Sequence, residues 1–255
     1  FPYTTLFRSF NDGVNTPYQK YLLKKNNKKY DGGINKFYSI SGTSIGAING
    51  YYLYTGNVDN LEKMWTNIKD IQNGNVKIVN NTVDNSPAID NLRELDDSNI
   101  EEMNFYVNYV EVDNKVVSEK IVDVSKMPRN EAIISISYSG LLPSNPNATL
   151  GFKEQFVKDV QEGIYDGFKL DGGLIRSALI EPLIGDNVDK IILISTKYNY
   201  ELPEDIKKVY DEDKIIVVRP NTQFAPKDTL NFDDEFCKTI YQEGYEIGKN
   251  ILDRL

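Results

Sequence analysis

The sequence predicts one α/β domain, built as a three-layer α/β/α sandwich around a mostly parallel central sheet. Apolar runs within residues 189–195 and 214–218 show no alternation with polar residues, which is typical of parallel strands buried on both faces. Segments with helical spacing of apolar residues lie between the strand-like segments along the chain. With 255 residues, 40% of them hydrophobic, the chain is long enough to bury one such core.

Periodicity predicts the elements in the first half of the chain. In residues 57–69 the apolar side chains fall on one helical face, and Trp65 on that face is assigned to the core rather than to a ligand site. Residues 104–112 and 116–124 alternate apolar and polar side chains on either side of a turn. This pattern predicts a β-hairpin whose charged residues form a solvated face.

The second half of the chain is predicted in the same way. Residues 151–163 carry apolar side chains at helical spacing and are expected to form a surface helix packed on the sheet, with a lid over a binding site as the alternative. Further helices are expected over residues 47–54, 86–95, 132–138 and 233–255.

Charge and composition limit the possible functions. A formal net charge of −9 opposes binding to nucleic acid and electrostatic capture by anionic lipid. No run approaches the roughly 18 consecutive apolar residues that a membrane span needs. The single cysteine, Cys237, permits no internal disulfide and favours a reducing compartment, so a cytoplasmic or peripheral membrane location is expected.

One stretch, residues 38–50 with the sequence YSISGTSIGAING, predicts a strand, a tight turn and a helix. Ser44 lies in the turn. Gly42 and Gly46 stand two residues before and after it, where Cβ atoms would collide as the strand reverses into the helix. The serine hydroxyl would then stand at the N-terminus of the helix, where amide groups and the helix dipole favour negative charge. Ser44 is therefore the candidate nucleophile.

The chain contains no histidine, which excludes a Ser-His-Asp triad. The group that takes the serine proton must then be a lysine or a carboxylate. Asp171 is the carboxylate with a distinctive setting, because it ends a short apolar run and is followed by Gly172 and Gly173. The same tripeptide at residues 31–33 follows a polar stretch and is assigned to a loop.

Together the two motifs resemble the patatin-like phospholipase family. The resemblance rests on G-T-S-I-G-A-I-N-G, in which Thr43 and Ile45 flank Ser44, and on the downstream D-G-G-L that begins at Asp171. It implies a Ser-Asp dyad that cleaves acyl ester bonds of phospholipids or related lipids through an acyl-enzyme intermediate. The substrate would be met at a membrane or micelle surface, and neither a metal nor a cofactor would be needed.

Two other interpretations stay open. The chain could be a catalytically weak or inactive protein of the same fold that binds lipid or a partner. It could also be a nucleotide-binding α/β domain in which the turn between Gly42 and Gly46 holds a phosphate, although neither common glycine-rich phosphate motif is present.

The loop that precedes the strand before Ser44 departs from the family pattern. In the family a glycine-rich loop supplies the oxyanion hole, and here only Gly13 matches it, so Gly13 and Val14 are the expected donors. Asn11 and Asp12 replace glycines, and both residue types tolerate positive φ. The Asp12 carboxylate would nevertheless oppose a developing oxyanion. Because losing one donor costs roughly 100- to 1,000-fold in rate, these changes could leave the enzyme slow or inactive.

Residues 1–9 resemble the translation of a sequencing adapter and stand where the family has a first hydrophobic strand. The expected domain is therefore residues 10–255, truncated at its N-terminus, and a chain with its native upstream segment is expected to be more stable and more active. The alternative is that residues 1–9 form a genuine strand.

Overall fold

The computed structural model describes residues 38–66, 77–98, 100, 103–144, 150–176, 178–225, 228, 231 and 233–250. The expectations for residues 1–9, for the loop around Gly13 and for residues 31–33 lie outside the described residues.

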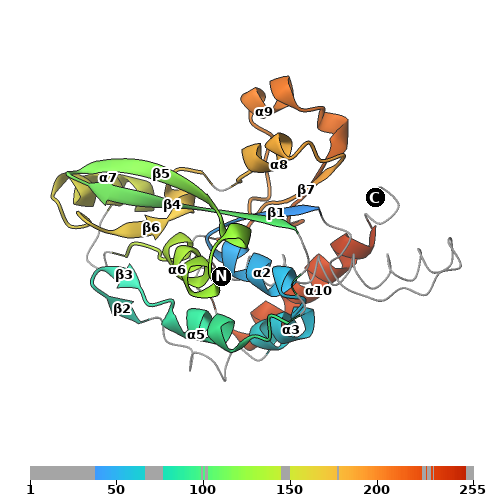
Figure 1. The fold of residues 1–255 in the computed structure, drawn as a ribbon, viewed down its shortest axis with the longest axis horizontal. Helices are drawn as coiled ribbons and strands as arrows, with labels where there is room; N and C mark the ends of the chain where they lie inside the picture. The colour runs from blue at the N-terminus through green and yellow to red at the C-terminus, as the bar shows by residue number, and fades with distance from the viewer. Residues whose placement is uncertain are drawn as a thin grey trace, which may run out of the picture.

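The central feature of the fold is a four-stranded sheet organised around the long strand β4, Asn104–Asp113. Strand β1, Ser39–Thr43, runs parallel to the first half of β4. Strand β5, Val116–Asp123, runs antiparallel along most of it. The short strand β6, Lys169–Asp171, is also antiparallel and pairs with residues 109–111 (Figure 1).

The sequence predicted a mostly parallel central sheet, and this expectation needs correction. In the described four-stranded sheet only the pairing of β1 with β4 is parallel, while β5 and β6 both pair with β4 in the antiparallel direction. The β4–β5 hairpin was predicted, and its turn explains the direction. Asn114 and Lys115 have φ values of 49° and 62°, the conformation of a tight type I′ turn. A turn of this length can join only antiparallel neighbours.

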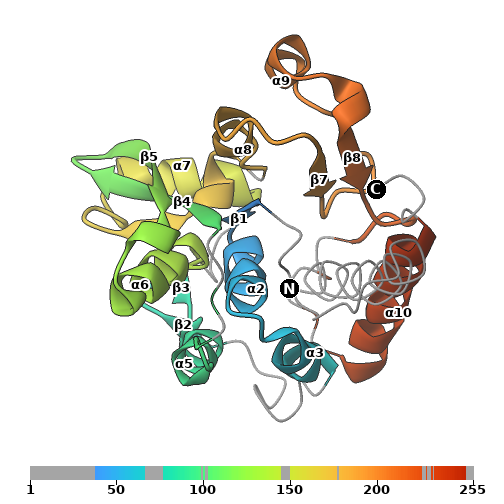
Figure 2. The ribbon, with the colours of Figure 1, turned by 45° about the vertical axis from the view of Figure 1, so that its right-hand side comes forward.

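The two apolar runs form a parallel pair, as predicted. Strand β7, Ile191–Ile194, pairs in register with β8, Ile215–Val218. Among the described residues neither strand pairs with β1 or β4, and Figure 2 shows the pair standing apart from the larger sheet. The structure thus contains α helices together with a mixed sheet and parallel strands, which is an α/β fold.

Helices surround these strands. Those at residues 45–54, 58–66, 86–94, 129–139, 152–161 and 234–250 coincide with predicted helices, whereas the short helices at residues 181–185 and 204–209 were not predicted. The early ones are α2 (Ile45–Tyr54), α3 (Val58–Thr66) and α5 (Ser86–Glu94), with a small hairpin of β2 (Ile78–Val79) and β3 (Thr82–Val83) between the last two. The later ones are α6 (Arg129–Ser139), α7 (Phe152–Gln161), α8 (Glu181–Gly185), α9 (Glu204–Val209) and α10 (Asp234–Asn250). Three short 3-10 helices, η1 (Val124–Lys126), η2 (Gly172–Leu174) and η3 (Glu212–Lys214), complete the described elements.

Apolar side chains leave β4 from both faces. Phe105 and Val107 belong to a core cluster with α2 and α6, whereas Val110 belongs to a second cluster with α7. Odd- and even-numbered residues of a strand point to opposite faces, so helices pack against both faces of this sheet. Because Phe156 and Val160 of α7 are buried in the second cluster, α7 is a helix packed on the sheet, as expected.

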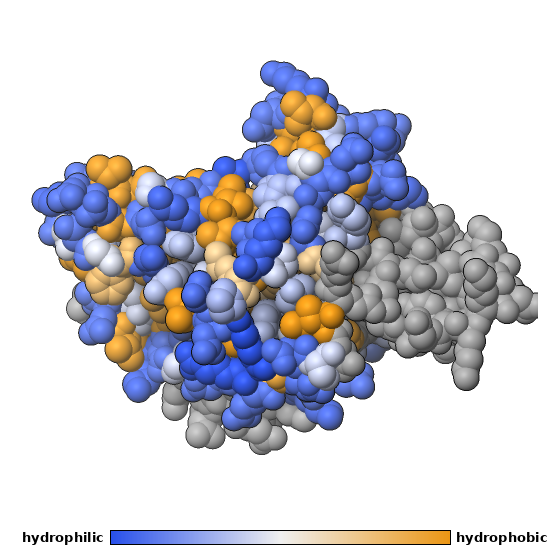
Figure 3. Space-filling view, in the orientation of Figure 1, coloured by the Kyte–Doolittle hydropathy of each residue, from blue (hydrophilic) through white to orange (hydrophobic). Residues whose placement is uncertain are grey.

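Trp65 lies in the first core cluster, as predicted, where its indole N–H donates a hydrogen bond to Asn49 Oδ1 at 3.2 Å. The surface is in contrast largely polar: in Figure 3 hydrophilic residues dominate the visible face and apolar groups are scattered among them. Among the described residues, no helix has the length and apolar character needed to cross a membrane.

Candidate active site

The two predicted motifs meet because β1 and β6 end at neighbouring positions of β4. Strand β5 occupies one edge of β4, so β1 and β6 must share the other edge. They run toward each other along it: β1 ends where Thr43 pairs with Asn108, and β6 ends where Asp171 pairs with Tyr109. The residue after β1 is Ser44. The sheet therefore brings the serine and the aspartate together although 127 residues separate them.

Ser44 occupies the strained turn that the sequence predicts for a nucleophile elbow. Its backbone angles are φ 59° and ψ −126°, outside the left-handed helical region that asparagine tolerates. A Cβ atom at Gly42 would lie 2.5 Å from the carbonyl oxygen of Gly46, so the close turn requires glycine there. The backbone N–H of Ser44 donates to Ser139 Oγ at 2.8 Å, which holds the turn against the end of α6.

The expectation for Gly46 needs correction. Gly46 lies in the first turn of α2, and apart from its chain neighbours and the backbone of its own helix, no atom of the described residues lies within 4 Å of the position that its Cβ would take. Of the two glycines that flank Ser44, only Gly42 is required by a close contact within the described structure. Gly46 borders open space.

Asp171 is buried, with a relative exposure of 3%, and its carboxylate has two hydrogen-bond donors. The hydroxyl of Ser44 donates to Oδ2, and the backbone N–H of Gly173 donates to Oδ1 at 2.7 Å. Burial raises the pKa of Asp171 to about 6, because the carboxylate loses water, while the two hydrogen bonds oppose that rise. A carboxylate with this pKa is a stronger base than an exposed one and is still mostly ionised at neutral pH.

This arrangement supplies the parts of a two-residue acyl-transfer site. The serine hydroxyl already donates to a group that can accept its proton, which is the geometry of an activated nucleophile. Of the two kinds of base left open by the sequence, the one that contacts Ser44 is a carboxylate. The hydroxyl stands beside the N-terminus of α2, whose first amide groups have no acceptor within the helix.

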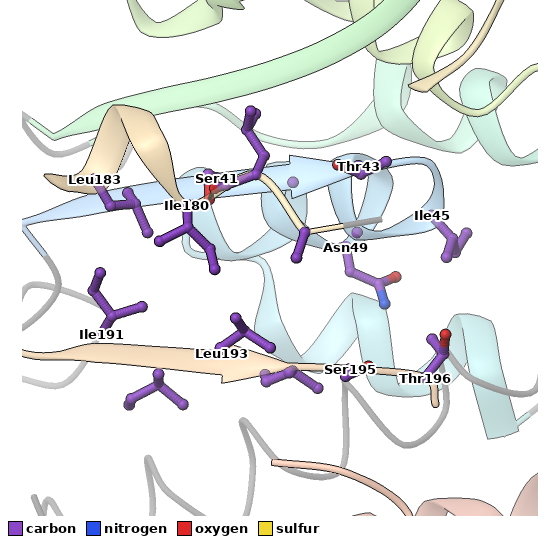
Figure 4. Close-up of a pocket in the computed structure, with 16 residues that line it drawn as sticks. Ser41, Thr43, Ile45, Asn49, Ile180, Leu183, Ile191, Leu193, Ser195 and Thr196 are labelled. Atoms are coloured by element: carbon purple, nitrogen blue, oxygen red, sulfur yellow. Dashed lines mark hydrogen bonds between the residues drawn. The ribbon is translucent and has the colours of Figure 1, made fainter. Parts of the chain in front are cut away.

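A small cavity of about 120 Å³ lies beside the elbow, between β1 with α2 on one side and β7 on the other. Figure 4 shows Ile180 and Leu183 pointing into it from one side and Leu193 from the other. Thr43 and Ile45, the neighbours of Ser44 in sequence, form part of its wall. As bounded by the described residues, the cavity has both apolar and polar walls, and neither Ser44 nor Asp171 lines it.

Two residues that contact the motifs were not predicted. Ser139 lies one residue beyond the helix expected over residues 132–138, and its contact with the turn at Ser44 depends on how α6 packs, which no local pattern reveals. Asn108 lies in the predicted hairpin but was given no role, and it is fully buried and bonded to Thr43. Its position among apolar neighbours in 105–112 was a usable signal. Gly13 and Val14, the predicted oxyanion donors, lie outside the described residues.

Comparison with protein families identifies a matching family. Residues 20–184, more than half of the chain, match the family model described as patatin-like phospholipase. The matched range contains both Ser44 and Asp171. No curated protein matches the chain.

Proposed function

The chain belongs to the patatin-like phospholipase family, a family of lipid acyl hydrolases, and on that premise we propose that it cleaves acyl ester bonds of phospholipids or related lipids with Ser44 as nucleophile and Asp171 as base. The observation that carries the proposal is the hydrogen bond from the Ser44 hydroxyl to the buried Asp171 carboxylate. The absence of histidine from the chain agrees with it, since a dyad of this kind needs no imidazole.

In the first half of the reaction, Ser44 Oγ attacks the carbonyl carbon of the ester while its proton passes to Asp171. The carbonyl π electrons move to the oxygen and give a tetrahedral oxyanion. When the oxyanion collapses, the C–O bond to the alcohol breaks and Asp171 returns the proton to the leaving oxygen. The acyl group is then bound to Ser44 as an ester.

In the second half, water replaces the alcohol. Asp171 takes a proton from the attacking water, a second tetrahedral oxyanion forms, and its collapse breaks the bond between the acyl carbon and Ser44 Oγ. The proton returns to the serine, and the fatty acid leaves. The raised pKa of Asp171 suits both steps, because the group must accept and then return a proton.

The oxyanion needs hydrogen-bond donors. The amides of Ile45 and Gly46, at the N-terminus of α2, are the donors of the described chain that adjoin Ser44, and the amide of the residue after the nucleophile has this role in nucleophile elbows. Gly13 and Val14 stay proposed as the other donors on the family resemblance alone.

We also infer that residues 10–255 form one domain with a three-layer α/β/α arrangement. The support for this is that separate helical clusters pack on the two faces of β4.

Hydrolysis of phosphatidylcholine vesicles tests the proposal through the release of free fatty acid. The unsubstituted chain should release it, Ser44→Ala should not, and both should unfold in a single cooperative thermal transition. Ser118→Ala is a control, because Ser118 is an exposed serine on β5, so this variant should keep activity. Equal release by Ser44→Ala would overturn the proposal. Vesicle binding without any release would favour the inactive lipid-binding alternative.

A further inference from the structure

We propose that Asn108 is a positioning residue for the Ser44–Asp171 dyad, and that Glu119 and Arg176 fix the orientation of its side chain. The inference rests on the proposed hydrolase function, since it concerns how the same two residues are held. It adds to that function a partly buried polar network, in which Asn108 is fully buried, on the face of the sheet opposite Asp171.

Asn108 lies at the point of β4 where the two motifs meet. Its neighbour across the sheet is Thr43, the residue before the nucleophile, and the Thr43 hydroxyl donates to Asn108 Oδ1 at 2.7 Å. The same Oδ1 lies 2.5 Å from the position that a Cβ atom of Gly172 would take. One side chain thus touches the residue just before Ser44 and the residue just after Asp171.

The orientation of this amide is not free. Asn108 Nδ2 donates to Glu119 Oε1 at 2.8 Å, and a carboxylate accepts hydrogen bonds but cannot donate them. The NH2 group must therefore face Glu119, which leaves the carbonyl oxygen facing Thr43 and Gly172. A flipped amide would place an NH2 group against Gly172 and would lose the contact with Glu119.

Glu119 is in turn held by Arg176. Arg176 Nη2 donates to Glu119 Oε2 at 2.6 Å, and its Nη1 donates to Glu181 at the start of α8. Arg176 follows the Asp-Gly-Gly turn by a few residues, so the ion pairs fasten the end of that turn to β5 and to α8.

A further hydrogen bond connects β1, the strand before Ser44, to the segment that precedes α8. The segment just before α8 accepts a hydrogen bond from β1, where Ser41 Oγ donates to the Leu179 carbonyl at 2.5 Å. Strand β1, strand β5 and the segment from η2 to α8 are therefore tied together around Asn108. Polar networks can hold reacting groups in place. Loss of a partner that orients a metal ligand commonly costs about 10- to 100-fold in activity, and we expect an effect of that order here.

The test is a double-mutant cycle on the pair of Asn108 and Glu119. Asn108→Asp places a second carboxylate beside Glu119, so the two negative charges repel each other. Glu119→Gln removes the negative charge that pairs with Arg176. The double variant Asn108→Asp/Glu119→Gln exchanges amide and carboxylate, so every contact again has a donor and an acceptor. It also moves one negative charge from position 119 to position 108, which is closer to the dyad.

A matched control exists on the same strand. Asn104 donates to Asp186 at 3.0 Å, also an amide-to-carboxylate contact, but it pairs with Ser39 at the far end of β1. Four residues of strand, about 13 Å, separate it from Asn108. Asn104→Asp should lower the thermal midpoint without changing the dyad.

The measurements are kcat and KM for p-nitrophenyl butyrate, with active sites counted by a fluorophosphonate, and the thermal midpoint. Each single variant should lower kcat per active site about 10- to 100-fold with little change in KM, and the exchange should restore most of it. In the exchanged variant the acid limb of the pH profile should lie about one pH unit higher, because a nearby negative charge raises the pKa of Asp171. Unchanged kcat in both single variants, or an exchange that restores stability but not kcat, would overturn the inference.

Failure of the proposed function can be told apart from failure of this inference. If the unsubstituted chain hydrolyses no ester, the function is wrong, and the titration of Asp171 is then read from stability alone, as the pH-dependent difference in thermal midpoint caused by Asp171→Asn. The pH at the midpoint of the Asp171 titration should be higher in Asn108→Asp than in the unsubstituted chain, and it should be unchanged in Asn104→Asp. An unmoved titration in Asn108→Asp would overturn the positioning role by itself.

Discussion

The Ser44 hydroxyl donates a hydrogen bond to the Asp171 carboxylate across the junction of two strands that run toward each other along the same edge of β4. Neither residue is held by a flexible loop alone. Ser44 is the N-cap residue of α2 and directly follows β1, and Asp171 is the last residue of β6. Sites built on such elements keep their geometry within the narrow limits that proton transfer needs.

Asp171→Asn should remove the base while it keeps the size and shape of the side chain. We expect kcat for ester hydrolysis to fall by about 100- to 10,000-fold, the usual contribution of a general base, while KM changes little. Steady-state kinetics on the variant and the unsubstituted chain measure both quantities. Near-normal kcat in the variant would direct attention to a lysine as base.

The pH dependence of kcat/KM should report Asp171 in the free enzyme. Because the ionised form accepts the serine proton and burial raises its pKa to about 6, kcat/KM should rise about tenfold per pH unit below pH 6 and level off above it. With no histidine in the chain, this limb cannot come from imidazole. A limb near pH 4, or one that persists unchanged in Asp171→Asn, would speak against the assignment.

The stability of the fold should depend on the same ionisation, but it should decrease as Asp171 ionises, whereas kcat/KM increases. The pKa of Asp171 is about 6 in the folded chain and near its ordinary value of 3.8 in the unfolded chain, so folding favours the protonated form. That favourable contribution is complete below pH 3.8 and is lost as the pH rises through 6. The thermal midpoint of Asp171→Asn relative to the unsubstituted chain should therefore increase between pH 4 and pH 7, as differential calorimetry can measure. A constant difference across this range would contradict the burial of an ionisable carboxyl.

Gly172→Ala and Gly46→Ala form an informative pair. A Cβ atom at position 172 would approach the Asn108 backbone oxygen to 2.6 Å, and backbone cannot move aside cheaply, so we expect a loss of about 1 to 3 kcal/mol in the free energy of unfolding. At position 46 the described residues leave open space inside a helix, where alanine is favoured over glycine. Chemical denaturation should show a loss only for Gly172→Ala. A comparable loss for Gly46→Ala would show that a close neighbour surrounds it too.

The local features of the site could be predicted from the sequence, because each is encoded within a few residues. The strand, turn and helix around Ser44, the turn after Asp171 and the β4–β5 hairpin all follow from glycine placement and periodicity. Strand direction could not be predicted in the same way. An apolar run shows that a strand is buried, whereas the pairing with β4 decides whether it is parallel.

The contacts that support the dyad were beyond the sequence for a related reason. Asn108, Glu119 and Arg176 come from three separate segments, and only the register of β4 with its neighbours brings them together. Periodicity correctly placed Glu119 on a strand and then assigned it to a solvated face. Pairing with Arg176 offsets the cost of its partial burial.

Covalent capture by an alkyl fluorophosphonate tests the Ser44–Asp171 dyad most directly, when the rate is followed against pH and the modified peptide is identified by mass. The account predicts one phosphonyl group per chain, attached to Ser44, with a rate that rises to a plateau above about pH 6 and is strongly reduced in Asp171→Asn. Attachment to another residue, or an equal rate in Asp171→Asn, would contradict it.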